Sequence, residues 1–153
     1  MRPRQREQAE RMRAVTTIIA VFVCSTVLAQ QPPPLLVVEV NGKYGFVNPR
    51  GQFVIPPLFG FAWGFSEGLA PVWVGKEVGF TDASGRFVIP PQFDDSSYQA
   101  TITEFSGGLA GATLDGGFGY IDRTGSFAIG PSFKKGQPFH DGIAEACDYT
   151  RCG

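Results

Sequence analysis

The residue pattern closest to a catalytic motif is Gly64-Phe65-Ser66-Glu67-Gly68. Its G-x-S-x-G spacing is that of the sharp turn that presents a serine nucleophile in many hydrolases. Such a serine needs a base to take its proton, and His140 is the only histidine in the 153 residues. The chemistry would be acyl transfer, with Ser66 attacking and His140 accepting the proton. A serine hydrolase is therefore one candidate function.

The surrounding sequence argues against that reading. The six-residue block that contains Ser66 occurs three times, at 65–70 (FSEGLA), 105–110 (FSGGLA) and 139–144 (FHDGIA). Ser66 and His140 hold the same place in their copies, so a structural repeat accounts for both of them. No helix-forming segment follows Ser66, as the nucleophile turn requires. We expect a protein that is not an enzyme, with the hydrolase as the alternative.

A longer repeat organises the chain. Three sixteen-residue segments align, YGFVNPRGQFVIPPLF, VGFTDASGRFVIPPQF and FGYIDRTGSFAIGPSF, which occupy residues 44–59, 78–93 and 118–133. Each precedes one copy of the shorter block, which gives units at about 44–77, 78–117 and 118–153 within a repeat region of 35–153. The second unit is six residues longer than the first, and its insertion contains Tyr98.

The elements of one unit are three short strands. Asn or Asp at the first turn position and Gly at the fourth, as in Asp82-Ala83-Ser84-Gly85, predict a type I turn that joins strands one and two. We expect Pro-Pro steps such as Pro56-Pro57 to end strand two, because proline cannot donate to a ladder. A loop then crosses to strand three, which is expected to start at Gly68 and its equivalents. Asn41-Gly42, Gly75-Lys76 and Asp115-Gly116 predict two-residue hairpins between units. The fold class is therefore all-β, with repeated antiparallel three-stranded units in a β-meander or an open solenoid-like array.

The hairpin turns also predict register and faces. A two-residue turn at Gly75-Lys76 places Trp73 opposite Val78 and Pro71 opposite Phe80. One face of such a pair carries large apolar side chains and the other carries small ones, so both faces are expected to be covered. The large face is either core or, in the alternative reading, an exposed aromatic stripe.

These segments resemble the WG (tryptophan-glycine) β-repeat family. The family's unit has an aromatic-Gly-aromatic start, a D-x-x-G turn, a V-I-P-P step and an F-x-E-G-L-A block, and the resemblance covers residues 35–153, about three units. The family's tryptophan is replaced by Tyr44, Val78 and Phe118, so the three units are divergent. The resemblance implies an all-β repeat fold, frequent export in bacteria, and a binding or scaffolding role. It implies no catalytic residues.

The amino-terminal segment has a different character. Residues 1–13 contain five arginines, and residues 14–29 form an uncharged, largely apolar run that ends in Ala29. A basic region, an apolar region and a small residue make up a secretory signal peptide, so we expect a signal-peptide helix that is cleaved between Ala29 and Gln30. The run is shorter than a typical membrane span, although an uncleaved anchor or a membrane-tethered stalk is the alternative. Residues 30–34 form a proline-rich linker.

Cys147 and Cys152 occupy the register of Trp73 and Val78, directly across a hairpin. Opposed residues at a site without ladder hydrogen bonds have Cα atoms about 4.5 Å apart, which is within disulfide range. We expect a Cys147–Cys152 disulfide in an exported chain, with a pair of free thiols as the alternative. With His140 alone nearby, these cysteines lack the spacing of a zinc site, so no metal and no cofactor is expected.

The charge balance limits the partners. Residues 1–29 hold five of the 13 basic and two of the 14 acidic residues, which leaves the remainder with a formal charge of −4. A mildly acidic chain does not favour nucleic acid, and contact with a membrane is expected only through an uncleaved amino-terminal segment. We predict a periplasmic or secreted, non-catalytic protein of the bacterial envelope. It would bind or scaffold a peptide, a protein or a cell-wall glycan, with Trp63, Trp73 and Tyr98 as candidate ligand contacts.

Overall fold

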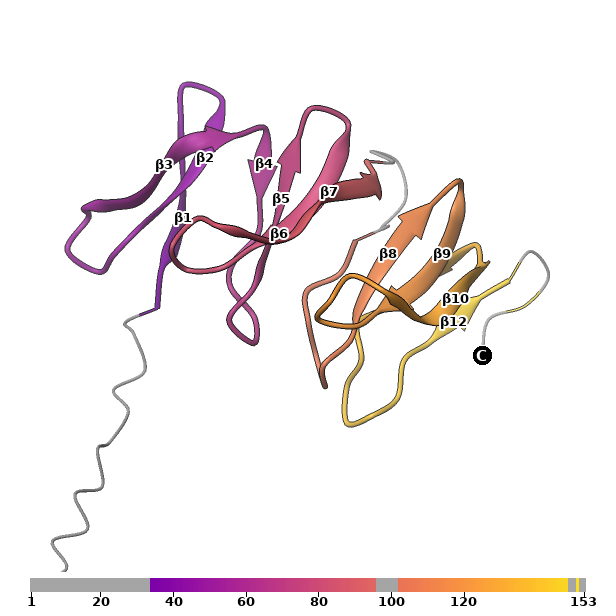
Figure 1. The fold of residues 1–153 in the computed structure, drawn as a ribbon. Coiled ribbons are helices and arrows are strands. Elements are labelled where there is room, and N and C mark those ends of the chain that lie inside the picture. Colours follow the sequence, from indigo (N-terminus) through magenta and orange to yellow (C-terminus); the bar gives the residue numbers. More distant parts are fainter. Residues whose placement is uncertain (1–33, 96–101, 149–150, 152–153) are drawn as a thin grey trace, which may run out of the picture. The chain divides into compact units, whose positions relative to one another are not determined.

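The computed structural model describes residues 34–95, 102–148 and 151, whose regular structure is entirely β-strand (Figure 1). The predicted signal peptide, its cleavage site at Ala29 and Gln30, residues 30–33 of the linker, Tyr98 and Cys152 lie outside this part. Within it there is no helix that is long and apolar enough to cross a membrane. The strands are β1 (Leu36–Val40), β2 (Lys43–Val47), β3 (Phe53–Phe59), β4 (Phe61–Ala62), β5 (Ala70–Val74), β6 (Glu77–Thr81), β7 (Phe87–Asp94), β8 (Ala110–Leu114), β9 (Gly117–Ile121), β10 (Phe127–Phe133), β11 (Lys135–Gly136) and β12 (Ala146–Cys147).

The strands form small antiparallel sheets, with the orders β1-β2-β3, β4-β5-β6-β7, β8-β9-β10 and β11-β12. Strand three of one unit therefore shares a sheet with strands one and two of the next, as β5 does with β6 and β7. The predicted register is confirmed, since Trp73 lies opposite Val78 and Pro71 opposite Phe80. The all-β class predicted from the sequence is confirmed as well.

Hairpin turns set this register. Asn41 and Gly42 both have positive φ (52° and 74°), as do Asp115 and Gly116, which is the pattern of a type I′ turn. At the Gly75-Lys76 turn only the glycine has positive φ, as in a type II′ turn. Both turn types match the right-handed twist of the strands that they join, so they fix the pairing of strands from successive units.

The turn between strands one and two is held by an Asn or Asp side chain. Asp82 Oδ1 accepts the backbone N–H groups of Ser84 at 2.9 Å and Arg86 at 3.1 Å. Asn48 makes the equivalent pair of bonds in the first unit, and Asp122 does so in the third. The hydrogen bond from the Ser84 hydroxyl is the main cause that lowers the pKa of Asp82 from its usual 3.8. The Thr124 hydroxyl likewise lowers the pKa of Asp122.

The prediction that prolines end strand two is wrong. β3 and β7 continue through their Pro-Pro steps to Phe59 and Asp94. Phe46 pairs with Ile55 and Tyr44 pairs with Phe59, so the Pro-Pro step lies in a bulge with two extra residues on β3. Proline lacks an N–H group, and in a bulge the ladder is locally interrupted, so the missing donors are tolerated there.

The bulge passes directly over a glycine of the neighbouring strand. A Cβ atom added to Gly45 would lie 2.6 Å from the carbonyl oxygen of Ile55, and one added to Gly79 would lie 2.7 Å from that of Ile89. At Gly119, in the third unit, the corresponding distance to the Ile129 oxygen is 2.5 Å. Only glycine allows this close backbone approach, which explains its place after Tyr44, Val78 and Phe118.

Both faces of the sheet β4-β5-β6-β7 pack against apolar side chains of neighbouring segments, as predicted. Its small-residue face, with Ala70 and Val72, packs in one hydrophobic cluster with Phe46, Ile55 and Phe59 of the first sheet. Its large-residue face packs in a second cluster with residues from the following unit. That second cluster contains Leu69, Val78, Phe80, Ile89, Phe93, Ile102, Phe105, Ala110, Ala112 and Ile121. The large face is therefore mostly core, and small residues let the next sheet approach it closely.

Strand three was predicted to start too early. β5 and β8 begin at Ala70 and Ala110, because the preceding glycines occupy a tight turn of their own. In the third unit only the two-residue strand β12 forms at this place. The short strands β4 and β11, which pair with β5 and β12, were not predicted.

We expect the stability of this fold to fall as the pH drops below about 4, because a carboxyl group with a lowered pKa stabilises the folded state only when ionised. The stabilisation is complete above the unfolded pKa near 3.8 and is lost as the pH falls through the folded pKa of Asp82 and Asp122. Asp82→Asn combined with Asp122→Asn should keep the turns, since Asn48 caps the first one, and should flatten this pH dependence.

The measurement is the thermal unfolding midpoint by circular dichroism at several acidic pH values. Asp115→Asn is the matched control for the loss of one negative charge, because Asn41 stands at the equivalent turn position. An unchanged pH dependence in the double variant would contradict the assignment.

Candidate functional site

The block that contains Ser66 forms a tight turn and not a nucleophile elbow. The N–H of Ser66 donates to the oxygen of Leu69 at 2.9 Å, and the N–H of Leu69 donates back at 3.0 Å. Glu67 and Gly68 between them have positive φ, at 49° and 82°. Equivalent bridges join Ser106 to Leu109 and His140 to Ile143. No helix follows Ser66 in the described residues, since β5 comes next.

The Ser66 hydroxyl is used to join two repeats. It donates to the carbonyl oxygen of Phe105 at 2.6 Å, from a partly buried position. Ser106 makes the same bond to the carbonyl oxygen of Phe139 in the third unit. Within the described residues, no hydrogen bond joins Ser66 to His140. The structure therefore does not bring the two predicted triad members together, and it gives Ser66 a structural partner.

Glu67 strengthens the same junction. Its Oε2 atom accepts the backbone N–H of Gly108 at 3.0 Å and lies 3.6 Å from Nη1 of Arg123. The Arg123 guanidinium in turn lies 5.8 Å from the centre of the Phe105 ring, which is within cation–π range. Both charged side chains are partly exposed, so the ion pair contributes well under 1 kcal/mol, and the junction depends more on packing and backbone contacts.

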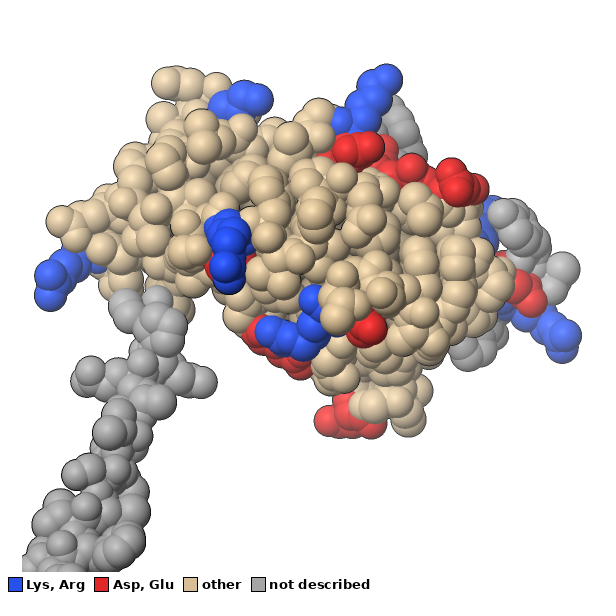
Figure 2. Space-filling model, viewed as in Figure 1, with Lys and Arg blue, Asp and Glu red and all other residues tan. Residues whose placement is uncertain are grey.

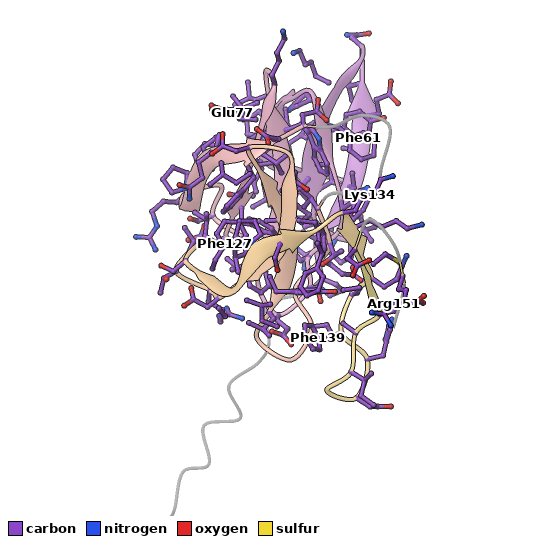
Figure 3. All side chains as sticks on the ribbon, turned by 90° about the vertical axis from the view of Figure 1, so that its right-hand side faces the viewer. Phe61, Glu77, Phe127, Lys134, Phe139 and Arg151 are labelled. Atoms are coloured by element: carbon purple, nitrogen blue, oxygen red, sulfur yellow. The ribbon has the colours of Figure 1, made fainter. Side chains whose placement is uncertain are left out.

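A surface group of aromatic side chains is the best candidate for a binding site. We define the aromatic cluster as Tyr44, Phe61, Trp63 and Trp73. Neighbouring ring centroids are 4.8 Å apart for Tyr44 and Phe61, 5.1 Å for Phe61 and Trp73, and 5.8 Å for the two tryptophans. Phe61, on the edge strand β4 (Figure 3), is 37% exposed and Trp63 is 38% exposed. The cluster is thus continuous and open to solvent.

Two carboxylates lie beside the aromatic cluster. Asp95 Oδ1 accepts the indole N–H of Trp73 at 3.0 Å, and Glu39 Oε2 accepts the hydroxyl of Tyr44 at 3.2 Å. Desolvation, with the Glu39 carboxylate nearby, raises the pKa of the Tyr44 phenol above its usual 10.0, so it is neutral at ordinary pH. The site therefore combines aromatic faces with carboxylate oxygens that can accept hydrogen bonds from a ligand.

The repeat does not require aromatic residues at the positions of Phe61 and Trp63. The N–H of Trp63 donates to the oxygen of Pro71, and the same bond is made by Thr103 in the second unit and Gln137 in the third. Phe61 and Lys135 pair with equivalent residues of strand three in their units. Lys135 therefore holds the position of Phe61 in the third unit. The cluster is therefore specific to the first unit, and the fold is built without it in the others.

Sequence reasoning identified part of this site. Trp63 and Trp73 were candidates, and the structure brings them together, with Trp63 exposed. Phe61 and Tyr44 were missed, although alignment of the three units would have shown that the other units lack an aromatic pair at Phe61 and Trp63. Tyr98 lies outside the described residues.

The predicted disulfide stays a prediction. Cys147 is 6% exposed and lies in β12, where it pairs with Lys135. Cys152 is outside the described residues. In the described part of the chain there is no group of three or more His, Cys, Asp or Glu side chains that could hold a metal ion.

We expect Ser66→Ala and Ser106→Ala to lower the free energy of unfolding by about 1 kcal/mol each, because each removes one hydrogen bond between repeats. Ser132→Ala is the control, since Ser132 is exposed and, among the described residues, its hydroxyl bonds only to Gly130, two residues away. Urea unfolding followed by circular dichroism measures the change. If Ser66→Ala alone abolished an ester-hydrolysing activity that Ser106→Ala retained, the hydrolase reading would be restored.

Comparison with known proteins agrees with the repeat architecture. The family described as WG containing repeat matches residues 44–75, 79–117 and 118–148, which together make up more than half of the chain. No curated protein and no solved structure gives a significant match. The matched segments begin at or next to the glycines over which the proline bulges pass. The chain therefore belongs to the WG repeat family.

Proposed function

We propose that this protein is an exported, non-catalytic binding protein, and that its aromatic cluster binds a glycan of the cell envelope. The observation that carries the proposal is the contact between Trp63 and Trp73 on an open surface that the repeat fold does not require. Tyr44 and Trp73 also pack against the core, whereas the exposed Phe61 and Trp63 have no aromatic counterpart in the other units and so no role in the shared architecture. Exposed apolar patches of this kind mark interaction sites.

Two features favour a glycan among the ligands considered. Sugar rings have C–H groups on their faces, and such groups pack on the electron-rich face of an aromatic ring. Asp95 and Glu39 lie beside the rings and supply acceptors for sugar hydroxyl groups. The side chains of an apolar peptide would contact the rings but would offer these carboxylates no further hydrogen-bond donors. A peptide or protein ligand is the second candidate.

Export is proposed from the amino-terminal segment. Residues 1–29 have the basic, apolar and small-residue regions of a signal peptide, with cleavage between Ala29 and Gln30. Cys147 and Cys152 would form a disulfide in the periplasm or outside the cell. Retention of residues 1–29 as a membrane anchor would place the same binding site at the membrane surface.

Surface charge is consistent with a neutral ligand. On the face drawn in Figure 2, Lys and Arg side chains and Asp and Glu side chains form small separate groups on a mostly uncharged surface. A nucleic acid partner requires a concentrated basic patch, which this face lacks.

Tryptophan fluorescence tests the proposal directly, because Trp63 and Trp73 are the only two tryptophans of the chain and both lie in the cluster. The chain recovered from the periplasm or medium should have the mass of residues 30–153. Adding a soluble tetrasaccharide of N-acetylglucosamine or of glucose should shift the emission and saturate. Trp63→Ala should weaken binding about tenfold or more, as expected when an aromatic anchor is truncated.

Phe53→Ala is the matched control, because Phe53 is an exposed aromatic residue on β3 outside the cluster. It should bind the oligosaccharide like the parent protein. Equal binding by Trp63→Ala and the parent would contradict a site at the cluster. A fluorescence response to an apolar peptide but to no oligosaccharide would overturn the proposal of a glycan ligand. It would favour a peptide or protein ligand. A recovered chain that still carries residues 1–29 would contradict cleavage.

A further inference from the structure

Strand three is covered along its outer edge by a short segment of its own unit. In the first unit the N–H of Gly60 donates to the oxygen of Trp73 at 2.8 Å, and the N–H of Trp63 donates to that of Pro71 at 3.2 Å. The segment between them is β4, which runs antiparallel to β5. The third unit repeats the pattern with Lys134 and Gln137 on either side of β11, and the second unit has the equivalent bond from Thr103 to Gly111.

β1 is the equivalent strand of the first sheet, and within the described residues nothing covers its outer edge. Its pairing with β2 places Val37 and Glu39 in the register of Pro71 and Trp73. The backbone oxygens of these two residues therefore point outward, as their equivalents do, and no described residue donates to them. An open strand edge of this kind is a template for pairing with another strand.

The chain cannot cover this edge with the turn that it uses elsewhere. In the first unit the covering segment returns through Glu67 and Gly68, which both have positive φ. The residues in that register before β1 are Pro33 and Pro34. Proline fixes φ near −65°, so this turn cannot form there. The residues directly before β1 therefore cannot cover it through this turn, and a strand of another molecule can pair with β1 in the same way.

The side chains of β1 indicate the chemistry of that strand. Glu39 is exposed and stands where β5 has Trp73, opposite the first residue of the covering segment. A basic residue at this point of an incoming strand would complement the Glu39 carboxylate. The next residue would lie opposite Val38, where the covering segments of the other sheets have Ala62 and Gly136, which are both buried. A small or aliphatic side chain fits this place.

We propose that the outer edge of β1 binds an extended peptide in the antiparallel direction, with a basic residue facing Glu39 followed by a small aliphatic residue. Two backbone N–H groups of the peptide donate to the oxygens of Glu39 and Val37, as those of Gly60 and Trp63 do in the next sheet. This edge shares Glu39 with the site that is proposed to bind glycan, but its occupant is a polypeptide that is held by backbone hydrogen bonds.

The test uses the purified chain and a fluorescein-labelled peptide, Ser-Ser-Lys-Val-Thr-Ser, with fluorescence anisotropy as the readout. Methylation of the backbone nitrogens of the serine before Lys and of Thr removes both donors and should weaken binding about tenfold or more. Methylation at Val is the matched control, because this residue would lie opposite Val38 as Ala62 lies opposite Val72, with its N–H group pointing away from β1. It should leave the affinity unchanged.

Charge reversal gives a second readout. Glu39→Lys should weaken binding of the Lys peptide and should strengthen binding of a second peptide that has Glu at the position of that Lys. Glu77→Lys is the control, because it changes an exposed charge on β6, and it should have neither effect. The proposal is overturned if both methylated peptides bind equally well. It is also overturned if Glu39→Lys leaves the preference unchanged, or if no peptide binds at millimolar concentration.

Discussion

In each of the three units, one glycine lies directly beneath the backbone of the neighbouring strand. This close approach holds the hairpin in shape. Gly79 illustrates the constraint, because a Cβ atom there would lie 2.7 Å from the Ile89 oxygen and from the nitrogen of Pro91. Without a side chain in the way, the Pro-Pro bulge can cross the partner strand. The bulge places three residues opposite one, so Ile89 and Phe93 on either side of it pair with Phe80 and Val78 on one face. That face then supplies the large side chains of a core.

The next sheet packs on this face. The structure describes two such interfaces between successive sheets, and both use equivalent contacts. A Cβ atom on the turn glycine Gly85 would lie 3.3 Å from the Ile55 side chain, and one on Gly125 would lie 2.8 Å from that of Ile89. Phe59 contacts Phe87 with ring centroids 6.3 Å apart, and Phe93 contacts Phe127 at 6.0 Å. The serine bonds between repeats follow the same rule. Each unit thus contacts its neighbours through one repeated interface. The geometry of that interface explains most of the residues whose types suggested catalysis.

The sequence predicted the parts of the fold that depend on local chemistry. Register followed from the hairpin residues, and the turn caps followed from Asn48, Asp82 and Asp122, because these signals act within a few residues. The path through Pro56-Pro57 could not be predicted from proline chemistry alone, since the cost of a missing donor depends on whether the ladder has a bulge there. β4 and β11 have two residues each, which is too short for any alternation of side chains to reveal. The aromatic cluster depends on residues far apart in the unit, and only the contrast between units indicates it.

The central claim is that close backbone approach, not turn conformation, requires glycine at the start of each unit. It is tested by comparing the free energy of unfolding of Gly79→Ala and Gly64→Ala in urea. Gly64 has open space around it and no positive φ, so alanine there should be neutral or stabilising by up to about 1 kcal/mol. Gly79→Ala should destabilise by about 1 to 3 kcal/mol or more, because its methyl group would overlap backbone that cannot rotate away. A Gly79→Ala protein as stable as the parent would contradict the account.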